Sequence, residues 1–179
     1  MKRKHIASVA TATAVLAALG AAAYAQDKFD KYSLKSPGGI AFSEFKGYEG
    51  WEMVSSARSD AELKVILANP VMIKAYKAGV PGNGRPFPEG AKMVKLQWKH
   101  QKSKEAPFVV EVPDVPTQAF VMMKDSKRFP TTGGWGYATF NHDVAGGTMT
   151  ADEAKGDCGH ACHVAVKSKD YIFHPYQKR

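Results

Sequence analysis

Cysteine is scarce in this chain of 179 residues, which contains only Cys158 and Cys162. So small a number excludes a fold held together by a framework of disulfides. A disulfide between these two cysteines would close a very short, strained loop and would leave the adjacent His163 without a role. A structural zinc site is also disfavoured, because it needs four ligands and the histidines on offer are His160, His163 and a distant third one.

The chain also lacks long uninterrupted helical stretches and clusters of basic residues. Ten prolines and sixteen glycines are spread along it, which excludes a bundle of long amphipathic helices. The formal net charge is +8, but the basic residues are scattered, with no arginine-rich helix and no basic-aromatic motif. We therefore expect a solvated basic surface and no nucleic-acid partner.

The C-terminal region does contain a motif for covalent haem attachment. Residues 158–163 read CGHACH, two cysteines followed directly by a histidine. Two thiols can form thioethers with the haem vinyl groups while the adjoining histidine ligates the iron. The usual signature has two residues between the cysteines and this one has three, so it is a rarer variant. We predict haem c held by Cys158 and Cys162, with His163 as the iron ligand.

The N-terminus predicts export from the cytoplasm. A basic start is followed by an apolar, alanine-rich stretch over residues 6–23 and by a small-residue cleavage pattern that ends at Ala25. We predict a signal peptide over residues 1–25 and a bacterial periplasmic location, with an uncleaved membrane anchor as the alternative. Residues 26–179 then form one domain, whose formal charge falls from +8 to +5 because the signal holds three basic residues.

Strands dominate the expected secondary structure. Alternation of side-chain types predicts a strand over residues 91–100. Further strands are expected over residues 51–55, 119–123 and 135–141. The prolines within residues 107–116 predict a loop. Residues 63–68 are ambiguous, because the capping-box pattern before them favours a helix and their aliphatic, β-branched composition favours a strand.

The expected helices are few and short. Asn69 as N-cap and Pro70 at the first helical position predict a helix that ends at Gly79. Thr150, followed by acidic residues, predicts a second helix start, which would place the haem motif on or just beyond a helical turn. Residues 26–50 are expected to form an N-terminal arm. The predicted fold class is mainly β, or α+β with a few short helices.

The place of the motif excludes two common haem c architectures. A class I cytochrome c carries its motif near the N-terminus and takes a methionine ligand far downstream, whereas here the last methionine, Met149, precedes the motif. The four-helix cytochrome c′ has a C-terminal motif, but it needs long helices that the prolines and glycines exclude. A β-rich haem c protein remains.

Several segments of the chain match one known family. They are Asn69-Pro70, residues 87–91 (FPEGA) with 94–95 (VK), 124–129 (KDSKRF), 134–135 (GW), the haem motif, and 170–173 (DYIF). In these segments the chain resembles cytochrome P-460 and its relative cytochrome c′-beta, over essentially all of residues 26–179. The resemblance implies an antiparallel β-sheet haem c domain, a periplasmic homodimer, and one haem whose iron has a proximal histidine and an open distal face.

The resemblance gives Lys95 a specific role. In cytochrome P-460 a lysine on the matching strand is bonded covalently to the porphyrin edge, and Lys95 occupies that position. A lysine desolvated against haem can lose its proton and attack an oxidised macrocycle. The alternative is a solvated lysine on a sheet face, since the strip that Lys95 shares with Met93 and Gln97 could face haem or lie at an edge. We expect the cross-link.

The expected distal residue is Phe120. Some cytochrome P-460 proteins have an acidic residue on this strand, which would relay protons from bound hydroxylamine, and phenylalanine cannot. An apolar distal residue instead resembles cytochrome c′-beta, which binds nitric oxide or carbon monoxide. Asp125 is a candidate proton acceptor just outside the pocket, although a turn residue beside Lys124 and Lys127 is more often a surface ion-pair partner.

Three functions follow from these expectations. The first is oxidation of hydroxylamine to nitrogen oxides at a five-coordinate haem, with a soluble electron acceptor such as a small cytochrome c. The alternative is binding of nitric oxide or carbon monoxide without turnover. The third, plain electron transfer, requires a sixth ligand from His100, His142, His160 or His174, and His160 is too close to the attachment loop to reach the opposite face.

Overall fold

The computed structural model describes residues 29–154 and 156–177, so the predicted signal peptide lies outside the described residues. The elements in order are η1 (Lys31–Ser33), η2 (Phe42–Phe45), η3 (Tyr48–Gly50), β1 (Glu52–Arg58), β2 (Leu63–Ala68), α2 (Pro70–Lys77), β3 (Lys92–Lys102), β4 (Glu111–Lys124), η4 (Pro130–Thr132), β5 (Trp135–Asp143), β6 (Thr148–Ala151), α3 (Asp157–His163) and η5 (Val164–Lys169). All of them belong to the compact unit that begins at Lys31. Among the described residues, no helix has the length and apolar character needed to cross a membrane.

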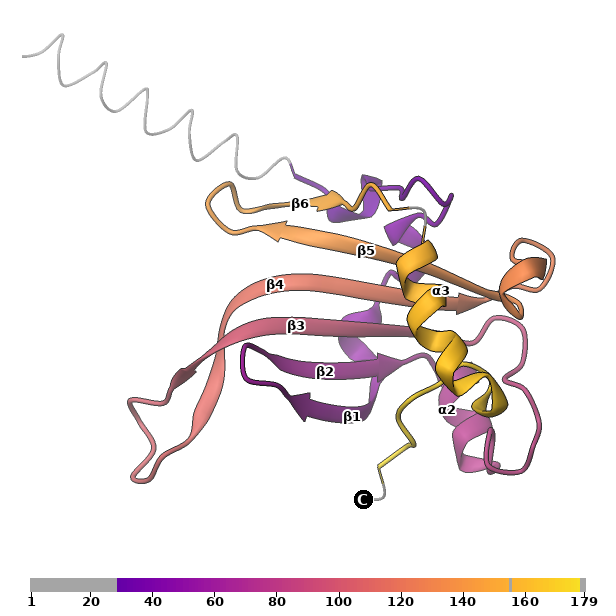
Figure 1. The fold of residues 1–179 in the computed structure, drawn as a ribbon. Coiled ribbons are helices and arrows are strands. Elements are labelled where there is room, and N and C mark those ends of the chain that lie inside the picture. The colour runs from indigo at the N-terminus through magenta and orange to yellow at the C-terminus, as the bar shows by residue number, and fades with distance from the viewer. Residues whose placement is uncertain (1–28, 155, 178–179) are drawn as a thin grey trace, which may run out of the picture. The chain divides into compact units, whose positions relative to one another are not determined.

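The strands form one six-stranded sheet in the order β1-β2-β3-β4-β5-β6 (Figure 1). Each strand is antiparallel to its neighbour. The expected fold class, an antiparallel sheet with a few short helices, is therefore confirmed. Figure 1 also shows α3 crossing in front of the sheet and α2 beside its end.

Each face of the sheet carries its own apolar cluster, because successive side chains of a strand point to opposite faces. On one face, Phe42 and Phe45 of the N-terminal arm pack with Val94, Val121 and other side chains of β3 to β5. On the other face, α2 and the C-terminal segment pack on Met93 and Met122. The arm and the C-terminal segment thus lie on opposite faces, and the second face contains the site.

The ambiguous segment is strand β2, which pairs with β1 and β3 on its two sides. Its apparent capping box is a hairpin turn, in which the Ser59 amide donates to the Glu62 carbonyl at 2.9 Å. These residues form a strand and not a helix because an interior position in the sheet buries Ile66 and Ala68 and lets the backbone hydrogen-bond to a strand on each side.

The predicted start of α2 is confirmed. The Asn69 side chain accepts a hydrogen bond from the Met72 amide at 3.1 Å, as an N-cap does. The same oxygen also accepts from the Lys92 amide at 3.0 Å, and the Asn69 Nδ2 donates to the Gly90 carbonyl at 2.8 Å. This one side chain therefore joins the helix to the beginning of β3.

Two local predictions are wrong. The expected loop extends too far, because Pro113 and Pro116 lie inside β4. They pair with β3 where the register is irregular around Trp98, and such irregularities tolerate proline. Thr150 does not begin a helix, because it lies in β6 opposite Asn141 of β5. The helix that carries the haem motif begins at Asp157.

Candidate functional site

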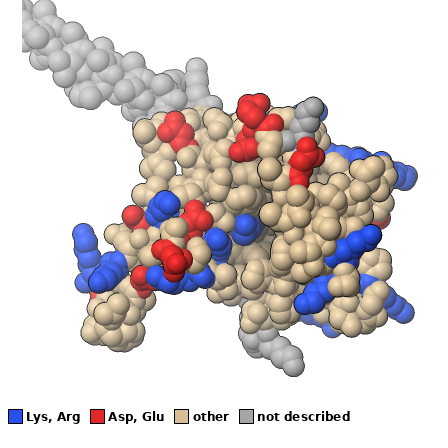
Figure 2. All heavy atoms as spheres, in the orientation of Figure 1, with Lys and Arg blue, Asp and Glu red and all other residues tan. Residues whose placement is uncertain are grey.

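A pocket opens on the second face of the sheet, between the central strands and the C-terminal segment. Its empty space, including the open mouth, is about 800 Å³. The floor consists of two rows of side chains paired across neighbouring strands. The first row is Ile66, Lys95, Phe120 and Thr139, and the second is Met93, Met122 and Tyr137. In the space-filling view this face is hollowed in the middle (Figure 2).

Helix α3 brings the two cysteines to one side. Cys158 and Cys162 are four residues apart, so they lie one above the other on the same helical face. Both thiols are exposed, and Cys158 lines the pocket. The unusual spacing of three residues between the cysteines is therefore compatible with attachment of a single group from one face of the helix.

Glycines allow α3 to lie close to β5. A Cβ atom at Gly159 would lie 2.9 Å from the Cβ of Tyr137, and one at Gly156 would lie 2.5 Å from the Tyr137 carbonyl oxygen. Gly156 also has φ +90°, a conformation that favours glycine. The glycine inside the haem motif thus has a packing role, because it lets the attachment helix rest on Tyr137.

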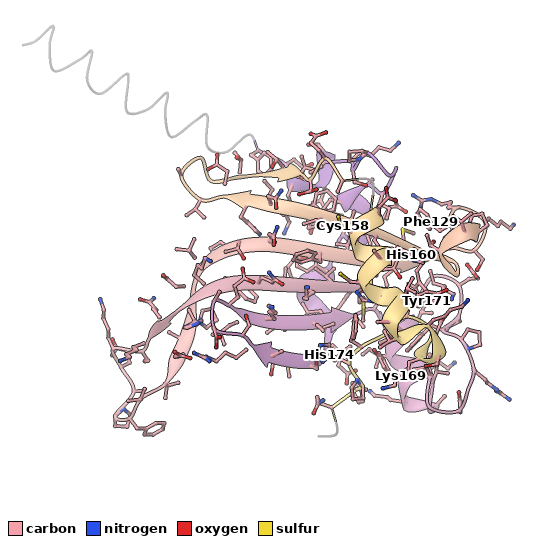
Figure 3. The ribbon with its side chains drawn as sticks, viewed as in Figure 1. Phe129, Cys158, His160, Lys169, Tyr171 and His174 are labelled. Carbon is pink, nitrogen blue, oxygen red and sulfur yellow. The ribbon has the colours of Figure 1, made fainter. Side chains whose placement is uncertain are left out.

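His163 is oriented by the segment that follows α3. Its Nδ1 lies 2.5 Å from the Tyr171 carbonyl oxygen, and a carbonyl can only accept, so Nδ1 carries the proton. The lone pair on Nε2 is then available to a metal. The ring packs against Tyr137 and Phe173, with ring centroids 5.3 and 4.8 Å apart. Figure 3 shows Tyr171 on the segment after α3.

The surroundings of His163 favour its neutral form. Burial lowers the pKa of His163, the hydrogen bond to Tyr171 opposes this, and the positive charge of Lys95 lowers the pKa further. A neutral imidazole is the form that ligates a metal. The lone pair, its orientation and the protonation state thus fit the role of an iron ligand.

Lys95 projects into the pocket from the middle of the sheet. Strand β3 lies between β2 and β4, so the strip that contains Met93 and Lys95 is not at an edge. Both side chains line the pocket. The Lys95 Nζ lies 3.9 Å from the centroid of the Phe120 ring, within cation–π distance. Lys95 and Phe120 are therefore neighbours on the same pocket wall as well as partners in the β3–β4 register.

The ammonium group of Lys95 is held in an unfavourable environment for charge. Burial lowers the pKa of Lys95, and the nearby Lys64 lowers it further, while Glu62 and Cys162 act in the opposite direction. Desolvation is the largest of these effects, as expected for a lysine on an apolar floor. A larger share of Lys95 is consequently in the neutral, nucleophilic amine form than in a solvated lysine.

Asp125 lies outside the set of pocket-lining residues. Its Oδ1 accepts from the amides of Lys127 and Arg128 at 3.2 and 3.0 Å, which closes a turn after β4. The sequence interpretation of Asp125 as a proton acceptor near the pocket is thus not supported by its position. The carboxylate is used locally, as Asx side chains in turns commonly are.

The four candidate sixth ligands are placed differently. His100 lies on the outer part of β3, with Nε2 3.1 Å from the Asp60 carbonyl oxygen, and His142 pairs with Met149 between β5 and β6; neither lines the pocket. His160 is on α3, packed against aromatic rings. His174 does line the pocket, from the tail beyond Tyr171 (Figure 3).

Sequence reasoning missed two tyrosines that complete the site. Tyr137 lies on the pocket floor, and its buried hydroxyl has no hydrogen-bond partner among the described residues. Burial raises the pKa of Tyr137 well above its usual range. Tyr171 contributes its backbone carbonyl. Period-two alternation from Trp135 places Tyr137 on the buried face, whereas no local pattern pairs the Tyr171 carbonyl with His163.

The chemistry of the lining is apolar with few ionisable groups. Of the described residues that line the pocket, none is Asp or Glu, and no cluster of three or more potential metal-ligating side chains occurs in the described part of the chain. An iron here would therefore depend on His163 and on a macrocycle. An exposed thiol on the pocket lining, a second exposed thiol four residues along α3, an oriented imidazole and an apolar floor fit haem c.

A comparison with protein families agrees with this geometry. The family model described as Cytochrome P460 matches residues 45–174, most of the chain. The matched range contains the whole sheet, both cysteines and His163. A comparison with curated proteins finds no match.

Proposed function

Because this chain belongs to the cytochrome P460 family and is therefore a haem c protein, we propose that it oxidises hydroxylamine to a nitrogen oxide. The observation that supports this is the placement of Lys95 in the same pocket as Cys158 and His163. With nitric oxide as the product, hydroxylamine loses three electrons and three protons. The electrons pass to a soluble acceptor such as a small cytochrome c, and the protons pass to solvent.

Each residue of the site has a role in this proposal. Cys158 and Cys162 form the thioethers, and the His163 Nε2 ligates the iron. When bound, the haem supplies the one-electron redox chemistry and an open position for a small ligand. Met93 and Phe120 keep the floor apolar and limit water around that ligand.

Lys95 is proposed to bond to the edge of the macrocycle. Its Nζ forms a bond to carbon, one N–H and one C–H bond are lost, and the released electrons and protons are taken up by an external oxidant of the peroxide class. The support is chemical: Lys95 lies in the same pocket as Cys158, and burial lowers the pKa of Lys95, which increases the share of the nucleophilic neutral amine.

Intact mass and the ferrous optical spectrum of the matured protein test the link. We expect a loss of hydrogens and a strongly red-shifted ferrous Soret band in the wild type, and neither in Lys95→Gln. Lys99→Gln, at an exposed lysine of the same strand that does not line the pocket, is the matched control and should retain both signals. Turnover of hydroxylamine with an artificial acceptor tests the activity itself, and a linked preparation without turnover contradicts the enzymatic proposal.

A second candidate function is binding of nitric oxide or carbon monoxide without turnover. The observation that favours it is the lack of carboxylates among the described pocket-lining residues, because proton removal from hydroxylamine needs a base. Phe120 then acts as an apolar gate. An unshifted five-coordinate haem c spectrum, gas binding and no hydroxylamine turnover would together identify this function.

We also propose that the protein is periplasmic and homodimeric, as the signal peptide and the resemblance suggest. Cell fractionation should recover the mature chain without residues 1–25. Size-exclusion chromatography with light scattering should give twice the mass of one chain, and a monomer at working concentration would contradict the dimer.

A further inference from the structure

Residues 124–129 and 170–173, two of the segments that carry the family resemblance, take no direct part in haem attachment. The structure joins them through Lys124 and Asp170. Lys124, at the end of β4, donates from Nζ to Asp170 Oδ1 at 2.9 Å and to Oδ2 at 3.2 Å. The same Nζ donates to the Gly133 carbonyl at 2.9 Å. The side chains of Lys124 and Asp170 are only 6% and 12% exposed. This is a buried ion pair beside the C-terminal segment.

The backbone at Asp170 is unusual for a residue with a side chain. Asp170 ends η5 with φ +49° and ψ +43°, and Tyr171 follows with φ +65°. A helix end in this left-handed conformation normally has glycine, because other residues pay a steric penalty there. The carboxylate explains the exception, since its Oδ2 also accepts from the Phe87 amide at 2.7 Å. Asp170 is thereby fixed to β4 and to the loop before β3.

The residue held next to this clamp is the one that orients His163. Tyr171 directly follows Asp170, and its carbonyl lies 2.5 Å from the His163 Nδ1. The direction of that carbonyl is set by the left-handed turn at residues 170 and 171. An unbroken series of contacts therefore leads from Lys124 through Asp170 and Tyr171 to the proximal histidine.

We propose that the Lys124–Asp170 pair is a positioning device for the proximal ligand, which fixes the Tyr171 carbonyl on His163 and so sets the reduction potential of the haem. The inference rests on the part of the proposed function in which His163 ligates iron. A hydrogen bond from Nδ1 makes the imidazole a stronger donor and stabilises the oxidised iron. Loss of the clamp frees the carbonyl, weakens this bond and favours the reduced iron.

The experiment uses the matured haem protein and two variants of the clamp. Asp170→Asn removes the charge but keeps a side chain that tolerates the left-handed conformation, and Lys124→Met removes the other charge at similar volume. We expect both to lower the iron–histidine stretching frequency in the resonance Raman spectrum of the ferrous protein and to make the reduction potential more positive. Arg58→Gln, which removes an exposed ion pair with Glu111 (Nη2 to Oε1, 3.1 Å), is the control and should change neither.

Several results would overturn the proposal. Wild-type frequency and potential in folded Asp170→Asn would do so, and so would an equal change in the control. If Lys124→Met does not fold, Asp170→Asn alone decides. Asp170→Gly, which keeps the backbone conformation without the carboxylate, should behave like Asp170→Asn, and wild-type behaviour would show that the ion pair is dispensable.

These readouts separate the clamp from the proposed activity. Neither uses hydroxylamine, so a protein without turnover but with the expected shifts contradicts only the enzymatic function. If the exported chain carries no haem, nitrogen-15 NMR of His163 still tests the clamp. The proton should then lie on Nδ1 in the wild type and be shared between both ring nitrogens in Asp170→Asn, and an unchanged tautomer would overturn the proposal.

Discussion

Single residues determine how closely the attachment helix approaches the sheet, and Gly159 is the clearest case. Gly159→Ala gains about 1 kcal/mol of helix propensity, but its Cβ would lie 2.9 to 3.0 Å from three atoms of Tyr137. Two of these atoms are anchored near the backbone, so overpacking at a cost of about 1–3 kcal/mol outweighs the gain. We expect a lower free energy of unfolding and a lower yield of matured protein, measured by denaturation and haem absorbance.

The matched control for this prediction is Gly50→Ala. A Cβ at Gly50 has no heavy atom within 4 Å, so we expect a change within about 0.5 kcal/mol. Equal stability of Gly159→Ala and Gly50→Ala would show that the close approach of α3 to Tyr137 does not matter.

Residue-scale prediction from the sequence was most specific where the signal was local. The haem motif is six consecutive residues, so its chemistry could be recognised without a structure. Lys95 and Phe120 came from the resemblance, and the structure places both in the pocket. The role proposed for Asp125 stays a prediction; the structure places its carboxylate in a turn outside the pocket lining. The Tyr171 carbonyl was missed because it is a backbone atom, which residue type does not reveal.

At the scale of elements, the junction of α2 with β3 depends on Asn69. Asn69→Ala removes the N-cap acceptor and the bonds to Lys92 and Gly90. We expect a loss of about 1–3 kcal/mol in the free energy of unfolding, because buried backbone groups are left unpaired. Asn83→Ala, at an exposed loop asparagine that also makes side-chain hydrogen bonds, should cost less. The two results being equal would contradict a special role for the cap.

The hairpin formed by β3 and β4 ends in an exposed apolar tip. Phe108 is 71% exposed and Val109 is 82% exposed. Phe108→Ser should therefore change the free energy of unfolding by less than about 0.5 kcal/mol. Phe140→Ala, at a phenylalanine with no exposed surface, should cost about 3–5 kcal/mol. Chemical denaturation of both variants tests the contrast, and a large loss in Phe108→Ser would mean that the tip is buried in solution.

Element-scale prediction shows where pattern reasoning stops. Alternation identified β3, and capping chemistry identified α2, because both signals are contained in about ten residues. Residues 63–68 stayed ambiguous because only pairing on both sides decides for a strand. The prolines of β4 and the position of Thr150 were misjudged for the same reason: an irregular register and a partner strand rescue residues that local rules assign elsewhere.

At the scale of the whole molecule, Arg128 joins the N-terminal arm to the end of the sheet. It donates to Glu44 from Nη1 at 2.7 Å and from Nη2 at 3.2 Å, and to the Gly39 carbonyl at 3.0 Å. Burial by itself would raise the pKa of Glu44, but the hydrogen bonds from Arg128 and the Ala41 amide outweigh it, so the pKa lies below its usual value.

This lowered pKa predicts how stability depends on pH. A carboxylate whose pKa is lower in the folded state stabilises the fold above its ordinary pKa, and the contribution is lost as pH falls through the folded value. Glu44→Gln should thus cost up to about 1 kcal/mol at pH 7, because the pair is partly exposed, and the difference from wild type should shrink below about pH 4. In an Arg128→Gln background, the effect of Glu44→Gln on the free energy of unfolding should depend little on pH. If the difference between wild type and Glu44→Gln is the same at pH 7 and below pH 4, the predicted role of the lowered pKa is wrong.

The fold class could be predicted from the sequence, but the packing of the arm and the tail on the two faces of the sheet could not. Composition and alternation indicated a β-rich chain, and the resemblance implied an antiparallel sheet. The face on which the pocket lies could not be deduced, because it depends on which of two apolar clusters the N-terminal arm covers. That choice is made by contacts between residues more than forty positions apart, such as Phe42 against Phe140.

The pocket walls and the ligand-bearing residues come from different parts of the chain, which has a practical consequence for engineering. The strands give the cavity its walls, whereas the thiols, the imidazole and the carbonyl that directs it all come from residues 158–171. A protein engineer could therefore replace residues 158–171 with a segment that carries other ligands and leave the sheet unaltered. The same arrangement makes the site vulnerable, since one proteolytic cut before α3 would separate both thiols, the imidazole and its carbonyl partner from the strands that form the pocket.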